Sequence, residues 1–495
     1  MAAKGLHVAQ DQPPSPSAPT ECGSPWTVRV GRGHAVLLLA LAAGAILGLG
    51  VAFLTPVFAL LALVGLACGV AIFLRPELGV LGFIVVANVL PFAVLPVRLV
   101  FSPTIVDAVL TSLLAAWVFW ALYRSAPLVG TPLNVLILLY LGLAVTAFVL
   151  GLTYSISPER VRLFMKSVNS TLFFFSVVNC VRARASLNRS VLALLLGGSV
   201  AAAIALVIQF LPESTAAALL SSLGVVGYPT GPDVLRPVAG TEVLRAIGTS
   251  IDPNVLGGLL MMVGALLAGQ IFSGKPLLQK RWLWVMALPV GSALMLTQSR
   301  GAMGGLVVAV LVVGGFRDRR LCAAILGTGI ATVLFGGLVG QILPLAAPFL
   351  GRIQSGLAFQ DPAAAMRLNE YANALRTISE YPWFGIGFGD PPSIDLFLGV
   401  SSIYLLIGQE MGLIGLAAFM AILGVLGVQL VRALRATRDE ELHGVLVSLA
   451  AALASAATAG LLDQYYVNIL FPHMIALFWL YVALAMVAVK LSRER

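Results

Sequence analysis

The chain has 495 residues, of which 59% are hydrophobic and only 10% are charged. This composition excludes a soluble globular protein, because apolar runs of about 20 residues, the length that crosses a bilayer as a helix, follow one another from residue 35 to the end. The net charge of +9 would suggest a nucleic-acid partner in a soluble chain. Here we attribute it to membrane topology, and we predict an all-α polytopic transmembrane bundle with no nucleic-acid partner.

Cysteine and histidine give no sign of a metal centre. The cysteine spacing fits neither a zinc motif nor a disulfide framework, so we expect no metal and no cofactor. The cysteines are Cys22, Cys68, Cys180 and Cys322, and the histidines are His7, His34, His443 and His473.

Residues 1–30 are rich in Pro, Ser and Gly, which predicts a disordered cytoplasmic tail. Residues 31–495 form the predicted transmembrane domain. The first apolar segment is long and has no convincing cleavage site, so we expect a retained span rather than a signal peptide. About fourteen spans are predicted, near 35–54, 57–74, 79–97, 104–123, 133–152, 163–181, 190–211, 255–272, 282–297, 301–316, 321–347, 404–431, 444–462 and 467–489.

The basic residues predict the orientation. With both termini cytoplasmic, twenty of the 30 Lys and Arg residues lie on the inner face, as the positive-inside rule requires. The other ten, nearly all arginines, gather on the outer face around residues 160, 240, 300 and 360. Arginine is suited to bidentate contacts with phosphate, so the pattern favours a lipid-linked anion held at the outer surface. Alternatively, these arginines contact lipid headgroups or nearby acids, which include Glu159, Glu242, Glu370 and Glu380.

Arg300 is the strongest single candidate on the outer face. It lies in LTQSRGA, between two apolar segments that are too short to cross the membrane unless the turn dips into its edge. A charge held there is costly, which indicates a functional role, although a structural arginine that reaches the surface is an alternative. Arg245 precedes a turn marked by Gly248 and Pro253, so it too is expected near the membrane surface.

A short amphipathic helix is predicted in the outer segment that precedes the span at 404–431. Asp361 suits the N-cap and Pro362 the first helical position, and Pro382 ends the helix. Arg367 shares a side with Tyr371, whereas Arg376 lies about 180° around the helix, so the two arginines cannot face one ligand. A single apolar stripe is expected at Leu368, Tyr371, Leu375 and Ile378.

Three stretches resemble one family. RAIGTSIDPNVLGGLL, LTQSRGAMGGLVVAVL and MRLNEYANALRTISEYPWFGIGFGD with the following SSIYLLIGQEMGLIGL are similar, in order and topology, to the O-antigen ligase and O-antigen polymerase superfamily. The resemblance covers about residues 240–430 closely. It implies a metal-independent, inverting glycosyltransferase of the bacterial inner membrane, with its site on the outer face.

The resemblance also implies substrates. Proteins of this superfamily take a glycan from an undecaprenyl-diphosphate carrier and transfer it to an acceptor sugar hydroxyl, on lipid A-core for ligases or on a second lipid-linked unit for polymerases. Membrane lipids are further expected partners. The outer loops 212–254 and 348–403 are expected to cover the site.

Site roles follow from the same comparison. Arg300 and Arg367 match the family arginines that hold the diphosphate, and the charge argument agrees with this. Further substrate contacts are expected from Arg245, Arg160, Arg352, Tyr371, Ser401 and Tyr404, with Trp383 as another aromatic candidate.

One departure concerns the base. Ligases of this group usually have a His-Asn pair where this chain has Ser401 and Ser402, and a serine cannot act as a base near neutral pH. We predict Glu410 as the substitute, with Asp390 and Asp395 as alternatives. The missing histidine favours a polymerase over a ligase. The competing hypotheses are a transporter of small anions or of lipid-linked glycan, and a non-catalytic relative that binds lipid-linked glycan.

Overall fold

The computed structural model describes residues 56–95, 103–123, 128–153, 157–228, 230, 234–237, 244–317, 362–388 and 400–494, with single residues among 41–48 and 320–327. The predicted tail at 1–30 and the predicted spans at 35–54 and 321–347 therefore lie outside the described residues, or almost entirely so. Two parts of the outer segment 348–403, residues 348–361 and 389–399, do too.

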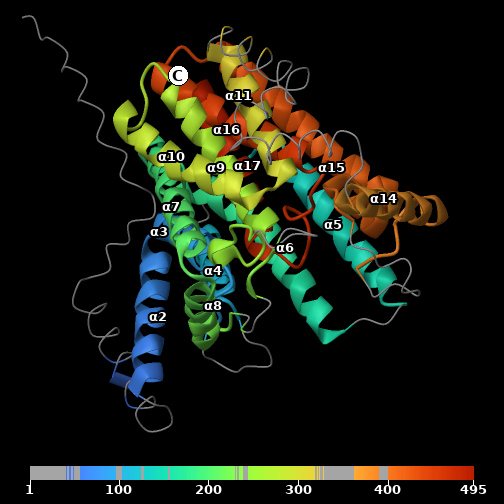
Figure 1. The fold of residues 1–495 in the computed structure, drawn as a ribbon. Coiled ribbons are helices and arrows are strands. Elements are labelled where there is room, and N and C mark those ends of the chain that lie inside the picture. The colour runs from blue at the N-terminus through green and yellow to red at the C-terminus, as the bar shows by residue number, and fades with distance from the viewer. Residues whose placement is uncertain are drawn as a thin grey trace, which may run out of the picture. The chain divides into compact units, whose positions relative to one another are not determined.

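The chain divides into two compact units, Met1–Arg75 and Pro76–Arg495. The first contains α2 (Pro56–Leu74). The second contains α3 (Pro76–Val89), α4 (Ile105–Tyr123), α5 (Asn134–Gly151), α6 (Pro158–Cys180), α7 (Arg184–Phe210), α8 (Glu213–Ser222), η1 (Leu223–Val226), η3 (Gly248–Ser250), α9 (Pro253–Ile271), α10 (Lys280–Thr297), α11 (Arg300–Arg317), α14 (Pro362–Glu380), α15 (Ile403–Ala436), α16 (Glu440–Ala459) and α17 (Pro472–Arg493) (Figure 1).

The membrane-protein prediction is confirmed. Within the described ranges, nine helices are long and apolar enough to cross a bilayer. Most predicted spans from residue 104 onward match a helix to within a few residues at each end, because long apolar runs bounded by polar or proline residues leave little choice of boundary. The total of about fourteen spans stays a prediction.

Aspartate side chains cap the starts of two helices, α9 near the candidate site and α16 at the opposite face. Asp252 accepts hydrogen bonds from the backbone N–H groups of Asn254 and Val255, at 2.7 and 3.1 Å, and so begins α9. Asp439 accepts from the Leu442 N–H at 2.9 Å and begins α16. Both satisfy donors that have no partner within the helix.

The core of the second unit is built on three helices. The apolar windows of α9, α16 and α17 are 83%, 78% and 89% buried. Helix α16 packs against α9, α11 and α17, and α17 packs along α6 (Figure 1). These helices carry many small residues, which allows their backbones to approach closely. Their ends therefore provide a rigid frame for the loops between them.

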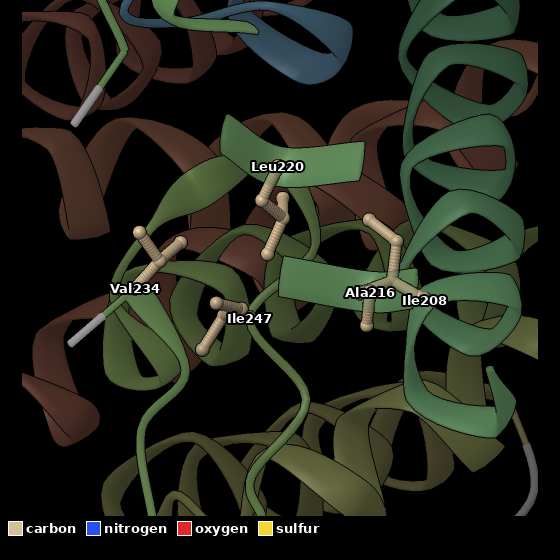
Figure 2. Close-up of a cluster of buried hydrophobic side chains, with 5 residues drawn as sticks. All are labelled: Ile208, Ala216, Leu220, Val234 and Ile247. Carbon is tan, nitrogen blue, oxygen red and sulfur yellow. The ribbon is translucent and has the colours of Figure 1, made fainter. Parts of the chain in front are cut away.

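A small hydrophobic cluster secures the segment before α9. It joins the end of α7 and one face of α8 to the chain that leads into η3 (Figure 2). Its buried members are Ile208, Ala216, Leu220, Val234 and Ile247. Ile247 lies two residues after Arg245, so the cluster fixes the backbone from which that arginine extends.

Ion pairs join the helices at the opposite ends. Arg184, at the start of α7, contacts Asp439 at 2.5 Å and Glu441 at 3.1 Å. Arg317, at the end of α11, contacts Glu440 at 2.8 Å. These residues lie at the other end of α11 and α16 from Arg300 and Ala459, so they mark the face opposite the candidate site.

Candidate functional site

A glycine-containing turn docks on a broken helix at the predicted outer face. Helix α15 is interrupted at Gly412, which has φ 68° and ψ −173°. The carbonyls of Gln409 and Glu410, which precede the break, accept hydrogen bonds from the N–H groups of Ile386 and Gly387 at 2.9 and 3.0 Å. The turn therefore replaces the helical donors that these carbonyls would otherwise use.

The exchange is reciprocal. The N–H of Leu413, which would bond to Gln409 in an unbroken helix, donates instead to the carbonyl of Pro382 at 2.7 Å. A side chain cannot be accommodated at Gly412, because an added Cβ would lie 2.3 Å from the Trp383 backbone. This explains physically why the PWFGIGFG and EMGLIG stretches occur together: each completes the backbone hydrogen bonds of the other.

Helix α14 forms with the predicted ends, and its buried positions are polar or small residues. It begins at Pro362 and ends at Glu380. Leu368 and Leu375 of the predicted apolar stripe are 50% and 57% exposed, so this part of the stripe is not packed against the described residues. The buried positions are Glu370, Ala374 and Thr377. The loop beside α14 has hydrogen-bonding groups, and the polar face of α14 therefore packs toward that loop.

The two arginines of α14 point in different directions, as the helical spacing predicted. The Arg367 side chain is 24% exposed and faces Asp463. The Arg376 side chain is 74% exposed and pairs with Glu380 at 3.0 Å on the same helix. Only Arg367 can therefore contribute to a site beneath α14.

Two side chains of α14 hold the entry to α15. The Glu370 carboxylate accepts a hydrogen bond from the Ser401 N–H at 3.0 Å. The Tyr371 hydroxyl lies 3.1 Å from the Ser401 carbonyl and 2.9 Å from the Leu461 carbonyl. Burial raises the pKa of the Tyr371 phenol, which keeps it a neutral donor. Of these two predicted substrate contacts, Tyr371 thus uses its hydroxyl on backbone carbonyls, and Ser401 bonds through its backbone to the side chains of Glu370 and Tyr371.

Tyr404 is similarly engaged. Its hydroxyl donates to the carbonyl of Ala457 at 2.7 Å and joins α15 to α16. About one turn after Ala457, the Gly460 carbonyl accepts a hydrogen bond from the N–H of Ile403 at 2.8 Å. These bonds fix the start of α15 on the end of α16, and the substrate-binding role of Tyr404 stays a prediction.

Asp463 brings two family motifs together. It lies in the 460–471 loop that joins α16 to α17, and its Oδ1 is 3.7 Å from the Arg367 guanidinium. Its Oδ2 lies against Gly301, the residue after Arg300, where an added Cβ would be only 2.5 Å away. The carboxyl is 4% exposed. The SRG turn and α14 therefore meet at this side chain.

The charges around Asp463 nearly balance. Burial raises the pKa of its carboxyl to about 7, and Asp252 and Glu370 add to the rise, while Arg367 and Arg245 act in the opposite direction. Its Oδ2 has no hydrogen-bond partner among the described residues. We call Asp463, Arg367, Arg245, Asp252 and Glu370 the Asp463 cluster; its central carboxyl can accept or release a proton near neutral pH.

Arg245 positions the turn that carries Arg300. Its Nε donates to the Thr297 carbonyl at 2.7 Å and its guanidinium to the Asn254 side chain at 2.6 Å. Thr297 ends α10, and Gln298, with φ 54°, leads directly into α11, which begins at Arg300. The half-buried Arg300 is thereby held on a turn braced by a second arginine.

A separate pocket surrounds Glu410. Tyr140, Phe164 and Trp479 line it together with Glu410 and Tyr466. It lies between α5, α6, α15 and α17. The 460–471 loop borders both this pocket and the Asp463 cluster.

Arg160 lies near this Glu410 pocket. Its guanidinium donates to the carbonyl of Phe388 at 3.4 Å, and Phe388 is itself part of the pocket wall. Arg160 is also near enough to Glu410 to interact with it electrostatically. The two therefore form a second pair of ionisable groups, separate from Arg367 and Asp463.

The remaining candidates fall in two groups. Arg352, Asp390 and Asp395 lie outside the described residues. The Trp383 side chain is 66% exposed. Within the described ranges, no three His, Cys, Asp or Glu side chains gather closely enough to hold a metal ion; metal independence stays a prediction.

The sequence analysis did not identify Asp463. It reads as one acid in GLLDQYY between two spans, without a neighbouring charge. The available signal was its position: an ionisable residue at the outer end of a span, on the same predicted face as Arg300 and Arg367. Only the fold shows that it contacts Arg367 and the turn that carries Arg300.

Comparisons with known proteins cover the same region. Residues 283–420 match the family model described as O-antigen ligase. The resemblance to the O-antigen ligase and polymerase superfamily is confirmed. Over 153 residues, the chain is 31% identical to an O-antigen ligase of Pseudomonas aeruginosa; this segment is 30% of the chain and 36% of that relative. The chain thus spans little more than a third of the relative's length.

The family match includes three predicted catalytic residues, Arg300, Arg367 and Glu410. The stretch at 245–260 and the 460–471 loop lie outside it. The superfamily assignment therefore rests on the SRG turn, α14 and the first part of α15, and the Asp463 cluster extends it with residues on either side.

Proposed function

We propose that this protein is a glycosyltransferase of the bacterial inner membrane that builds surface polysaccharide at the outer face. The observation that carries the proposal is the meeting of Arg367 and the Arg300 turn at Asp463, inside a region that matches the O-antigen ligase family. The family match supports glycan transfer in polysaccharide assembly. The donor would be a glycan on undecaprenyl diphosphate.

The reaction forms one bond and breaks one. The acceptor hydroxyl oxygen bonds to the anomeric carbon with inversion, the bond from that carbon to the diphosphate oxygen breaks, and the hydroxyl proton passes to a base. Arg300 and Arg367 would stabilise the negative charge that builds on the leaving diphosphate. A donor placed at such a charge is worth about 3–4 kcal/mol of the barrier in comparable sites.

Asp463 is the base that the geometry favours. It is buried beside Arg367, carries an oxygen without a partner among the described residues, and has a pKa of about 7. A base of this strength suits proton transfer near neutral pH. Glu410, the base predicted from the sequence, faces a different pocket together with Arg160 and stays a second candidate. The pH dependence of the rate distinguishes the two carboxylates.

The acceptor can be another lipid-linked unit or a lipid A-core sugar. Ser401, where ligases usually have histidine, favours a polymerase, whereas the matched family model and the matched relative both carry the ligase name. Purified full-length protein in nanodiscs would be given an undecaprenyl-diphosphate oligosaccharide with either acceptor, with and without EDTA.

Each product has a different meaning. We expect a ladder of lengthened lipid-linked glycan that EDTA does not suppress. One added glycan on lipid A-core identifies a ligase instead. Movement of donor across a liposome membrane without any new glycosidic bond contradicts the proposal and supports a transporter.

A further inference from the structure

A second pocket, with two cations on a largely apolar wall, lies at the membrane face opposite the candidate site. It is formed by Val181, just after the end of α6, by the last turns of α17 around Lys490, and by the segment before α5. Both helices begin at the outer face, at Pro158 and Pro472, so the pocket is one membrane thickness away from the Asp463 cluster. By the positive-inside rule this is the cytoplasmic leaflet.

The pocket combines two cations with an apolar wall. Arg182 and Lys490 line it, and Val178, Val181 and Met486 form much of the remaining surface. The Lys490 side chain is 46% exposed, and its recorded acidic contact is Glu494, at 3.6 Å on its own helix. Such an exposed pair is weak and leaves the ammonium available to an anion.

The pocket is held in shape by Asn179, which is 2% exposed. Its carbonyl accepts a hydrogen bond from the Arg182 Nε at 2.7 Å, which orients the guanidinium. Its side-chain oxygen accepts from the Val129 N–H at 2.9 Å, which holds the facing wall, and its amide donates to Phe175 at 2.9 Å. One buried residue therefore fixes both, the cation through its backbone carbonyl and the opposite wall through its side chain.

The adjoining surface is apolar. The wall that includes Val129 and Thr131 leads into α5, whose first turns expose Val135 and Leu138 at 77% and 55%. Exposed aliphatic side chains on a membrane-spanning helix face acyl chains. A ligand with a phosphate at the rim and hydrocarbon along α5 would match both parts of the pocket.

We propose that this pocket binds the headgroup of an anionic phospholipid of the inner leaflet, with Arg182 and Lys490 contacting its phosphate. Basic pockets between helices on the cytoplasmic side have the charge and shape that anionic headgroups require. Arginine supplies paired donors and lysine a mobile point charge. The site is independent of the glycan-transfer proposal.

The test is lipid retention by the full-length protein. Native mass spectrometry and thermal unfolding would be measured with phosphatidylglycerol, with phosphatidylcholine and with inorganic phosphate. At about 1 kcal/mol per basic residue, Arg182→Gln with Lys490→Gln should weaken phosphatidylglycerol binding roughly thirtyfold at low salt. Lys490→Gln alone, which changes an exposed side chain, should weaken it about fivefold.

The matched control removes the same charge elsewhere on that face. Arg432→Gln with Arg435→Gln changes two exposed residues at the end of α15 and should leave binding nearly unchanged. Equal loss in the control and the pocket variants, or no loss in either, overturns the proposal. Equal stabilisation by inorganic phosphate and phosphatidylglycerol also overturns it, because the site would then recognise a free anion rather than a lipid.

Discussion

The Arg367 guanidinium lies 3.7 Å from the carboxylate of Asp463, and the other oxygen of that carboxylate lies against Gly301. A helix of the outer loop, the turn that carries Arg300 and the 460–471 loop therefore converge on one buried acid. A charge buried in this way is costly unless it is compensated, and such sites are often functional. The predictions below test its protonation, its frame and its arginines.

The pH dependence of stability should report Asp463. Its pKa is about 7 in the folded chain and near 3.8 when exposed, so its contribution to stability is complete below pH 4 and is lost as the pH rises through 7. Asp463→Asn should remove this slope and stabilise the protein at pH 8 by about 2–4 kcal/mol relative to the parent. Thermal unfolding from pH 4 to pH 8 measures it.

The control for this experiment is Glu213→Gln, which removes an exposed acid at the start of α8. It should leave the slope as it is in the parent protein. A parent protein whose unfolding temperature does not change between pH 5 and 8, or an Asp463→Asn variant with the parent's slope, would show that the carboxyl is ionised throughout this range.

The pH profile of activity should separate the two carboxylates. If Asp463 takes the acceptor proton, turnover rises with pH to a plateau with an apparent pKa near 7, and Asp463→Asn lowers the rate about 10²–10⁴-fold. Glu410→Gln should keep the position of this rise. The finding that Glu410→Gln abolishes the rise, while Asp463→Asn keeps it, would assign the base to Glu410.

The helix break should be necessary for a stable outer face. Gly412→Ala places a side chain in a backbone conformation that is nearly restricted to glycine, and its Cβ would lie 2.3 Å from Trp383. We expect a loss of about 2–4 kcal/mol of stability. Thermal unfolding of the purified protein in detergent measures the difference.

Gly424→Ala is the matched control, because it lies on the same helix and an added Cβ there meets nothing within 4 Å. It should be neutral or stabilising by about 0.5–1 kcal/mol, since alanine favours a helix over glycine. Equal stability of the Gly412 and Gly424 variants would mean that the break does not depend on glycine.

The sequence predicted most helices but not the convergence. Apolar runs and prolines determine where helices such as α14 begin and end, because those are local properties. The sequence indicated the apolar stripe with Leu368 and Leu375, but not that Glu370 and Tyr371 of the same helix bond to the loop at Ser401. Asp463 is separated by about 100 residues from Arg367, and no local pattern can reveal such a contact.

The backbone exchange at Gly412 was also beyond sequence reasoning. The pattern showed glycines in two stretches, and it predicted a turn in the first. That the turn supplies hydrogen bonds to the carbonyls of Gln409 and Glu410 depends on tertiary packing. The arginine pattern, in contrast, was informative because charge on the outer face of a membrane protein has few structural explanations.

The most direct test of the account is the rate of glycan transfer from an undecaprenyl-diphosphate donor by Arg300→Gln and Arg367→Gln, with Arg376→Gln as the control. Arg376 lies on the same helix as Arg367 but faces away. We predict that each of the first two variants lowers turnover about 10²–10³-fold at saturating acceptor, with normal expression and unfolding temperature, while the control keeps the parent rate. Turnover in Arg300→Gln and Arg367→Gln equal to that of the control would contradict a role for these arginines in holding the departing diphosphate.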